Sequence, residues 1–198
     1  MLQTTTKLRE LILSRNDIDE GAAILGAALG RNSTVKKLSM QRIDSITTIG
    51  MQSFLQKLSN NSTLEELNIS DNHLDDQVLV ELARSFGTST NLKSLIISSV
   101  KEESSLNSLN QYGWRTLLNS VLRPDSVIEK LDIFGCDYIN DDGLRLLGNN
   151  STLKTLTFAN TRYSTFDGWD AFCQCLSNPG NMLEELTVQC LGDTTRAC

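Results

Sequence analysis

The chain has 198 residues, of which 39% are hydrophobic and 21% are charged, and its formal net charge is −6. This composition is that of a soluble globular protein of one or two domains. No run of Lys or Arg is present that would neutralise a phosphate backbone, which argues against nucleic acid as a partner. The longest strongly apolar stretch, Gly21 to Gly30, has ten residues. A transmembrane helix needs roughly 18, so we expect no membrane span.

Seven copies of the pattern apolar-x-x-apolar-x-apolar follow one another along the chain, and each predicts a short β-strand. Their first positions are 27, 29, 28, 36, 25 and 30 residues apart, a period typical of a repeat protein. The apolar positions are Leu8, Leu11 and Leu13; Val35, Leu38 and Met40; Leu64, Leu67 and Ile69; Leu92, Leu95 and Ile97; Ile128, Leu131 and Ile133; Leu153, Leu156 and Phe158; and Leu183, Leu186 and Val188.

A helix is predicted after each of the first six strands. Five repeats carry a glycine at one position, which we call the glycine slot, and Val78 takes it in the third repeat. Apolar residues recur one, four, five and eight positions after the slot, offsets that mark one face of a helix. The slot glycines are Gly21, Gly50, Gly113, Gly143 and Gly168.

Nearly the same phrase precedes three of the strands: RNSTV at Arg31 to Val35, and NNSTL at Asn60 to Leu64 and at Asn149 to Leu153. We expect the helix to end in this phrase, with a residue that tolerates left-handed geometry. That residue would be Asn32, Asn61 or Asn150. Side-chain caps at the helix starts are expected from Asp19, Asp76 and Asn140.

The same phrases also spell N-glycosylation sequons. Their recurrence at one position of the repeat favours a role in the turn, although the sequence leaves open whether any is glycosylated. The sequon residues are Asn32, Asn60, Asn61, Asn149 and Asn150.

The motif LxxLxLxxN is complete at Leu8 to Asn16 and at Leu64 to Asn72, and in this the chain resembles the ribonuclease-inhibitor subtype of the leucine-rich repeats. The resemblance implies an α/β horseshoe solenoid, with a parallel concave sheet, outer helices and about six and a half repeats of ~28 residues. We expect one array over 1–198, incomplete at both ends. The family's Asn or Cys position holds Asn16, Asn72 and Cys136, but Ile43, Val100, Thr161 and Leu191 elsewhere.

No constellation of residues indicates catalysis, a cofactor or a metal site. The single His, His73, is expected in a surface loop. The five Cys include no CxxC pair, so a reducing, cytoplasmic setting is expected. Cys136 and Cys173 are predicted to be buried, and Trp114 and Trp169 are predicted to pack in the core.

A binding surface is expected on the concave sheet and the loops that follow its strands. Most residues predicted to face out of this sheet are small and polar, but Ile96, Lys130, Asp132 and Phe134 place apolar surface beside charge on adjacent strands. The fourth repeat is eight residues longer than the norm of 28, and the excess follows its strand. Insertions of this kind often serve binding. Tyr138, Arg162 and Tyr163 lie in the equivalent loops of the next two repeats.

These features predict a non-catalytic module that binds another protein, of unknown identity, through its concave face and post-strand rim. Two alternatives stay open. One is a regulator of a small GTPase, because a family of GTPase activators resembles the same repeat class. The other is the sensor region of a larger immune-receptor-like protein.

Overall fold

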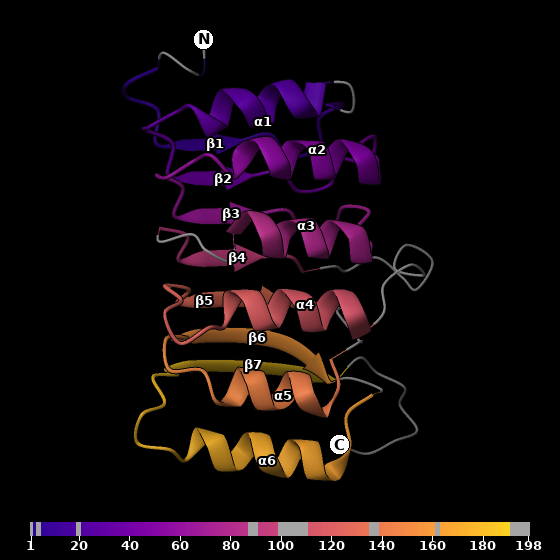
Figure 1. Cartoon of the computed structure of the whole chain (residues 1–198), viewed down its shortest axis with the longest axis vertical. Coiled ribbons are helices and arrows are strands. Elements are labelled where there is room, and N and C mark those ends of the chain that lie inside the picture. The colour runs from indigo at the N-terminus through magenta and orange to yellow at the C-terminus, as the bar shows by residue number, and fades with distance from the viewer. Residues whose placement is uncertain are drawn as a thin grey trace.

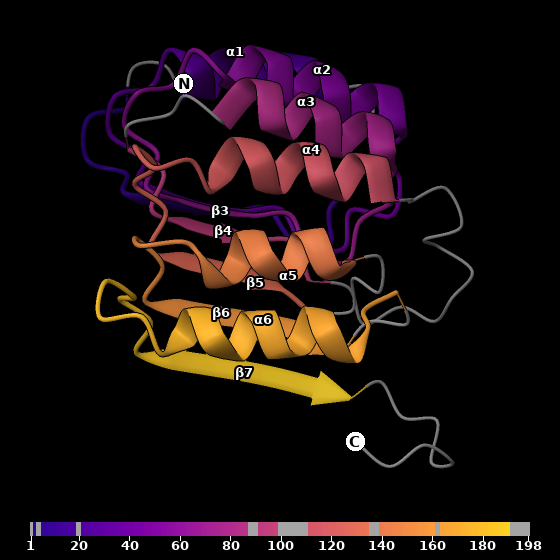
Figure 2. The same cartoon turned by 60° about the horizontal axis from the view of Figure 1, so that its bottom comes forward.

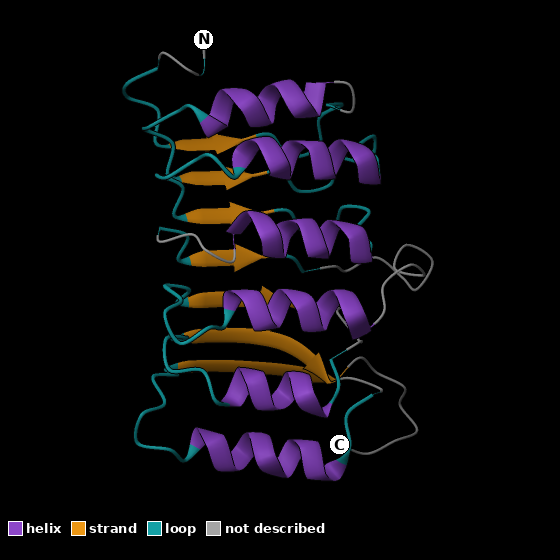
Figure 3. Ribbon diagram, viewed as in Figure 1, coloured by secondary structure: helices purple, strands orange, loops and turns teal. Residues whose placement is uncertain are grey.

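The computed structural model describes residues 2, 5–18, 21–86, 91–98, 111–134, 139–160 and 163–190. Within them, seven parallel strands form one sheet in chain order, and six helices cover one face of it (Figure 1; Figure 3). This is the predicted solenoid. The strands are β1 (Glu10–Ile12), β2 (Lys37–Ser39), β3 (Glu66–Asn68), β4 (Ser94–Ile96), β5 (Lys130–Ile133), β6 (Thr155–Asn160) and β7 (Glu185–Cys190). The helices are α1 (Ala22–Gly30), α2 (Thr48–Leu58), α3 (Asp76–Phe86), α4 (Gln111–Val121), α5 (Asp141–Gly148) and α6 (Phe166–Leu176).

The second leucine of each motif forms a continuous column through the interior. Leu38 pairs in register with Leu67, and Leu131 pairs with Leu156. From β2 to β6 these leucines are at most 1% exposed, because the neighbouring repeats and the helix layer enclose them. Burying a leucine side chain contributes roughly 1.5–3 kcal/mol, so the column is a main source of cohesion between repeats.

At two of the slot glycines, Gly113 and Gly168, successive helices approach each other closely. A Cβ on Gly113 would lie 2.5 Å from Asp76 Oδ1 of the preceding repeat. At Gly168 the same clash would involve Asp141. The Asp141 carboxylate accepts hydrogen bonds from the backbone N–H and the hydroxyl of Thr165, each at 2.7 Å, and these bonds lower its pKa. The residue two positions before the slot thus joins its repeat to the next one.

Helix starts are capped at a different set of residues from the one expected. Asn140 does cap α5, since its Oδ1 accepts from Gly143 N at 3.1 Å. In α3 the cap is Asp75, which accepts from Val78 N at 2.9 Å, while Asp76 is the first helical residue. Thr47 and Thr165 cap α2 and α6. Asp19 lies outside the described residues.

The asparagines of the NST phrases act through their side chains and not through left-handed backbone. Asn61 Oδ1 accepts from Thr63 N and Leu64 N, at 2.9 and 2.7 Å, and its Nδ2 donates to Leu29 O of the preceding repeat at 2.7 Å. Asn32 and Asn150 accept the same two backbone N–H bonds and are 3% and 7% exposed. Asn150 Nδ2 donates to Leu122 O of the preceding repeat, whereas Asn32 Nδ2 donates to Leu2 O. The turn interpretation of the phrase is confirmed, whereas the left-handed geometry is wrong.

Candidate functional site

The concave sheet surface is mostly polar. The central outward residue of each strand is half-buried from Ser39 in β2 to Thr157 in β6, because the curved sheet crowds its inner face. Ile12 of β1 is an exception at 64% exposed. The inner surface is therefore a shallow floor of small polar side chains, with apolar groups at a few places only.

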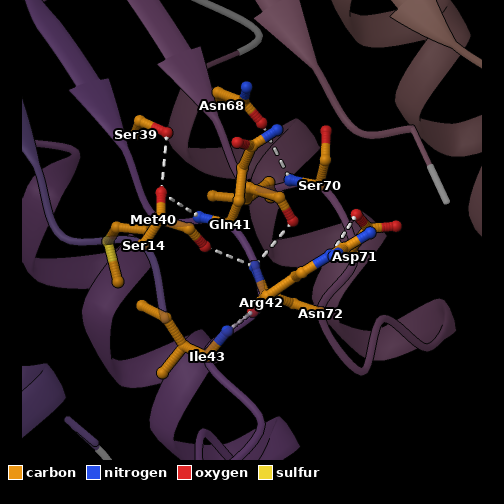
Figure 4. A network of polar contacts seen from close by, with 11 residues as sticks. Ser14, Ser39, Met40, Gln41, Arg42, Ile43, Asn68, Ser70, Asp71 and Asn72 are labelled. Atoms are coloured by element: carbon orange, nitrogen blue, oxygen red, sulfur yellow. Dashed lines mark hydrogen bonds and ion pairs between the residues drawn. The ribbon is translucent and has the colours of Figure 1, made fainter. Parts of the chain in front are cut away.

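A hydrogen-bonded rim follows the ends of β1 to β3 (Figure 4). Ser14 Oγ and Ser39 Oγ lie 3.1 Å apart, and Arg42 Nε donates to Asp71 Oδ2 at 3.1 Å. Asn72, which is 3% exposed, donates to Met40 O and Ile69 O at 2.7 Å each. Its Oδ1 accepts from Ile43 N at 2.9 Å. The motif asparagine therefore joins two repeats at this rim.

Left-handed backbone occurs at this rim, in three equivalent positions. The φ angles are 60° at Arg15, 53° at Arg42 and 57° at Asp71. Each N–H donates to a carbonyl of the next repeat, the acceptors being Gln41, Ser70 and Ser98. The sequence did not indicate these positions, because none holds the Gly or Asn that usually marks left-handed geometry.

Three of the predicted binding residues lie together on β4 and β5. Ile96 pairs in register with Asp132, and Lys130 lies two residues before Asp132 on the same face. Ser98 donates its hydroxyl hydrogen to Asp132 Oδ1, which also accepts from Phe134 N at 3.2 Å. Among the described residues nothing donates to Asp132 Oδ2. A hydrogen-bond acceptor, Asp132 Oδ2, therefore lies on the same surface as the exposed Lys130 side chain.

Phe134, which was expected to be exposed, is half-buried. Ser70 and Ala159, in the equivalent positions of other repeats, are 3% and 0% exposed. The reason is that the ladder of hydrogen bonds continues past the strand ends, as from Arg42 N to Ser70 O, so neighbouring backbones shield this row. Phe134 keeps an accessible portion because its ring is larger than the Ser and Ala side chains.

Of the remaining predicted residues, Tyr163 is the one that the structure describes. Tyr163 is 46% exposed in the loop before α6. Tyr138, Arg162 and most of the fourth-repeat insertion lie outside the described residues. How these groups lie relative to Phe134 therefore stays a prediction.

The helical face carries a feature that the sequence did not predict. An open groove of about 290 Å³ lies over α2, α3 and the start of α4. Two carboxylates line it, and one of them, Glu81, is 8% exposed and accepts from Arg84 Nη1 at 2.8 Å. The other lining residues are Gln52, Asp76, Gln77, Val80 and Tyr112.

From Lys36 onward, positive and negative side chains alternate in the row immediately before the strands. Lys36 Nζ lies 2.5 Å from Glu65 Oε1, and this hydrogen bond lowers the Glu65 pKa. Lys154 Nζ lies 3.0 Å from Glu129 Oε2, which raises the Lys154 pKa. All four side chains are well solvated, so each pair contributes little to stability. The row instead sets a charge pattern along the edge of the sheet.

The described residues include no group of three or more His, Cys, Asp and Glu side chains placed to hold a metal ion. His73 is exposed in its loop, as expected. Trp114 is 1% exposed and belongs to the core, whereas Trp169 is half-buried and packs against the core, with its ring stacked on Phe158 at a centroid distance of 5.7 Å.

The prediction that Cys173 is buried is wrong, because this side chain is exposed. Leu55, Ala83 and Leu118 take the same position in α2, α3 and α4 and are at most 5% exposed. This position faces the next helix, as the contact that a Cβ on Gly148 would make with Phe172 shows. No described helix lies beyond α6. Cys136 lies outside the described residues, and a cytosolic setting stays a prediction.

Native-state thiol labelling checks this correction. We expect Cys173 to react with a maleimide as fast as a small model thiol, since solvent reaches its sulfur. Cys175 should react more slowly, because it is half-buried and its Sγ donates to Asn149 Oδ1 at 3.1 Å. Peptide mapping after a short pulse separates the two. Equal protection of both thiols until unfolding would contradict the exposed position of Cys173.

Comparison with known proteins agrees with the repeat register. The leucine-rich repeat family pattern matches residues 5–24, 60–83 and 126–148. Ribonuclease inhibitor from Sus scrofa is 27% identical over 221 residues, an alignment that covers 98% of this chain and 47% of the relative. The chain thus spans about half the length of that relative.

Two solved structures share the fold at low sequence identity. The tropomodulin C-terminal domain of Caenorhabditis elegans superimposes with a TM-score of 0.57 at 14% identity, covering 79% of this chain and 90% of that one. Leiomodin-1 actin-binding site 2 superimposes with a TM-score of 0.51 at 16% identity, covering 88% and 80%.

No helix among the described residues has the length and apolar character needed to cross a membrane. The seven-strand parallel sheet, the period of the motifs and the match to ribonuclease inhibitor agree with one another. The chain is a leucine-rich repeat protein of the ribonuclease-inhibitor-like type.

Proposed function

We propose that this protein is a non-catalytic module that binds another protein through its concave face and post-strand rim. The observation that carries the proposal is the patch formed by Ile96 of β4, Lys130 and Asp132 of β5 and Phe134 directly after β5, which combines apolar surface with both signs of charge. Elsewhere the side chains of the inner face are mainly small and polar, and burying such side chains against a partner contributes little to the free energy of binding. Interface hot spots are instead enriched in large side chains beside polar groups.

The patch is suited to a partner segment that carries both an apolar and a basic side chain. Asp132 Oδ1 accepts hydrogen bonds from Ser98 and Phe134 N, and among the described residues its Oδ2 accepts none. The Phe134 ring, one row further along, gives the apolar contact. Tyr163 extends this surface toward the rim, and we place Tyr138 and Arg162 on the same side from their sequence positions. Neither nucleic acid nor a membrane is proposed as a partner.

Substitution of Phe134 tests the site. A partner is first captured from a lysate with the intact chain and identified by mass spectrometry. Phe134→Ala should then weaken the binding of that partner by roughly 2 kcal/mol, the scale of an interface hot spot, because the contact with the ring is lost. The melting temperature should fall only slightly, since the ring is half-buried. Calorimetric titration of the purified pair gives the affinity.

Ile12→Ala is the matched control. Ile12 is also an apolar residue on the concave face, is 64% exposed and lies on β1, three strands from β4. Its removal should leave the affinity unchanged. Ser70 is unsuitable as a control because it is buried. If Phe134→Ala leaves the affinity unchanged, the partner binds elsewhere; if it lowers stability as much as a core substitution, Phe134 belongs to the core.

A further inference from the structure

The groove over α2, α3 and the start of α4 lies on the outer face of the molecule, whereas the concave patch lies on the inner face of the sheet. Figure 2 shows these three helices side by side in the helix layer. A helix packs on each side of this group, α1 on α2 and α5 on α4. The groove is therefore inside the array, and its exposure is not that of an end face.

Val78 accounts for the place of the groove. It takes the glycine slot of α3, and a slot residue faces the preceding helix, as the contact between Gly113 of α4 and Asp76 of α3 shows. Val78 therefore lies against α2, and its side chain is 0% exposed. Because valine fills space that glycine leaves to the neighbouring helix, α3 cannot approach α2 as closely as α4 approaches α3. The surface is hollowed above this junction.

Glu81 is a buried carboxylate at a position that the other repeats fill without charge. It is 8% exposed, and it accepts hydrogen bonds from Arg84 Nη1 at 2.8 Å and from Ser85 Oγ at 3.4 Å. The Arg84 side chain is 71% exposed, so this cation reaches the carboxylate from the solvent side. A buried carboxylate is stabilised by each cation that approaches it. The equivalent residues, three after the slot, are Ile24, Ser53, Thr116, Leu146 and Ala171.

Apolar side chains flank the carboxylates of the groove. Val80 is a half-buried lining residue, and Tyr112, at the start of α4, lines the groove and is 66% exposed. Ile49 of α2 is 74% exposed and lies one residue before the slot, as Gln77 and Tyr112 do in α3 and α4. These three residues thus form a row across the three helices. Large exposed side chains beside polar groups are typical of a contact surface.

The charge and shape of the lining favour one kind of occupant. The described lining residues carry two carboxylates, Asp76 and Glu81, and one guanidinium, Arg84, a net charge of −1. An open groove of about 290 Å³ has room for a long side chain that enters from the solvent. Arginine matches these features, because its planar guanidinium donates to carboxylates and stacks on aromatic rings and is more weakly hydrated than an ammonium group.

We propose that this groove binds an arginine side chain that another protein presents, at a site separate from the concave patch. The guanidinium lies against Glu81 and Asp76 and stacks on Tyr112. Apolar residues of the partner on either side of the arginine pack on Val80 and Ile49. Because the groove and the concave patch lie on opposite faces of the sheet, both surfaces can be occupied at the same time.

NMR titration of the intact, nitrogen-labelled chain with a capped tripeptide, arginine between two leucines, tests the site. The side-chain amide signals of Gln52 and Gln77 should shift and saturate, since both line the groove and Gln52 Nε2 lies 3.5 Å from Gln77 Oε1. Half-saturation is expected on the order of 1 mM, the range for a single anchoring side chain. The same peptide with citrulline, a neutral isostere of arginine, should cause no saturating shift. The assay does not involve Phe134, so its result is independent of the concave site.

Charge variants at Gln77 test the electrostatic part of the proposal. Gln77 is exposed, so Gln77→Lys and Gln77→Glu should both fold as the wild type does. Gln77→Lys should raise the dissociation constant of the arginine peptide about threefold, and Gln77→Glu should lower it about threefold, the scale of one solvated charge a few ångströms away. Because these variants lack the Gln77 amide, the Gln52 signal is followed.

Gln174→Lys on α6 is the matched control, since it makes the same change of net charge at an exposed helix residue two helices away from α4. It should leave the dissociation constant unchanged. Three results would each overturn the proposal: no saturating shift with the arginine peptide, equal binding of the citrulline peptide, or a loss of affinity in Gln174→Lys as large as that in Gln77→Lys. The last result would show attraction to the net charge of the chain and not to the groove.

Discussion

Leu67→Asp should unfold the array. The Leu67 side chain is 0% exposed and lies in the column between Leu38 and Leu95. The substitution removes leucine packing worth roughly 2–5 kcal/mol and places a carboxylate within the buried hydrophobic cluster. Together these losses should exceed about 5 kcal/mol, against a total stability that is typically 5–15 kcal/mol. Far-UV circular dichroism during urea denaturation gives the free energy of unfolding.

The repeat register makes the same prediction for Leu131→Asp and Leu156→Asp, since these side chains are 0% and 1% exposed. Ile12→Asp is the matched control, because Ile12 also lies in a strand but faces out of the sheet at 64% exposure. It should change the free energy of unfolding by less than about 1 kcal/mol. If all three buried variants kept the wild-type urea midpoint, the assignment of the inward column would be refuted.

Asn72→Ala should destabilise the protein by about 3 kcal/mol, because it leaves buried backbone groups of two repeats without their partners. Asn72 donates to Met40 O and Ile69 O and accepts from Ile43 N, and its side chain is 3% exposed. The alanine side chain cannot form hydrogen bonds with these backbone groups, and water has little access to them. The urea midpoint measures the loss.

Asn16→Ala is the control at the same motif position. Asn16 donates to Leu13 O and Ser14 O, but its side chain is exposed, so water can replace both bonds. We expect a loss below about 1 kcal/mol. Equal losses for the two variants would show that burial at the rim does not set the energetic value of this asparagine.

Local patterns in the chain were sufficient to predict the strands and the helices. The motif leucines and the helix-face residues recur at spacings that only one register satisfies, and each strand includes the central leucine of its predicted motif. The slot glycines were also recognised, although their physical reason was not. The contact between Gly113 and Asp76 joins residues 37 positions apart in the chain, which a local pattern does not describe.

The errors arose where the answer depended on the neighbouring repeat. Asn61 was expected to adopt left-handed geometry, but it bonds to Leu29 O of the preceding repeat instead. Phe134 was expected to be exposed, but adjacent backbones shield its row. Part of the proposed binding patch could be predicted, because strand alternation placed Ile96 and Asp132 on one face of the sheet. The exposure of Phe134 could not be predicted, because it depends on the neighbouring repeats.

By itself, the sequence determined the repeat period, the inward face of every strand and helix, and therefore the solenoid, because these follow from side-chain spacings within one repeat. Only the tertiary structure decided which inward or lateral positions are covered. Cys173 and Leu55 have the same place in their repeats, yet one is exposed and the other buried, because a following helix packs on α2 and none among the described residues packs on α6. Burial is a property of neighbours in space, and each repeat obtains those neighbours from the next.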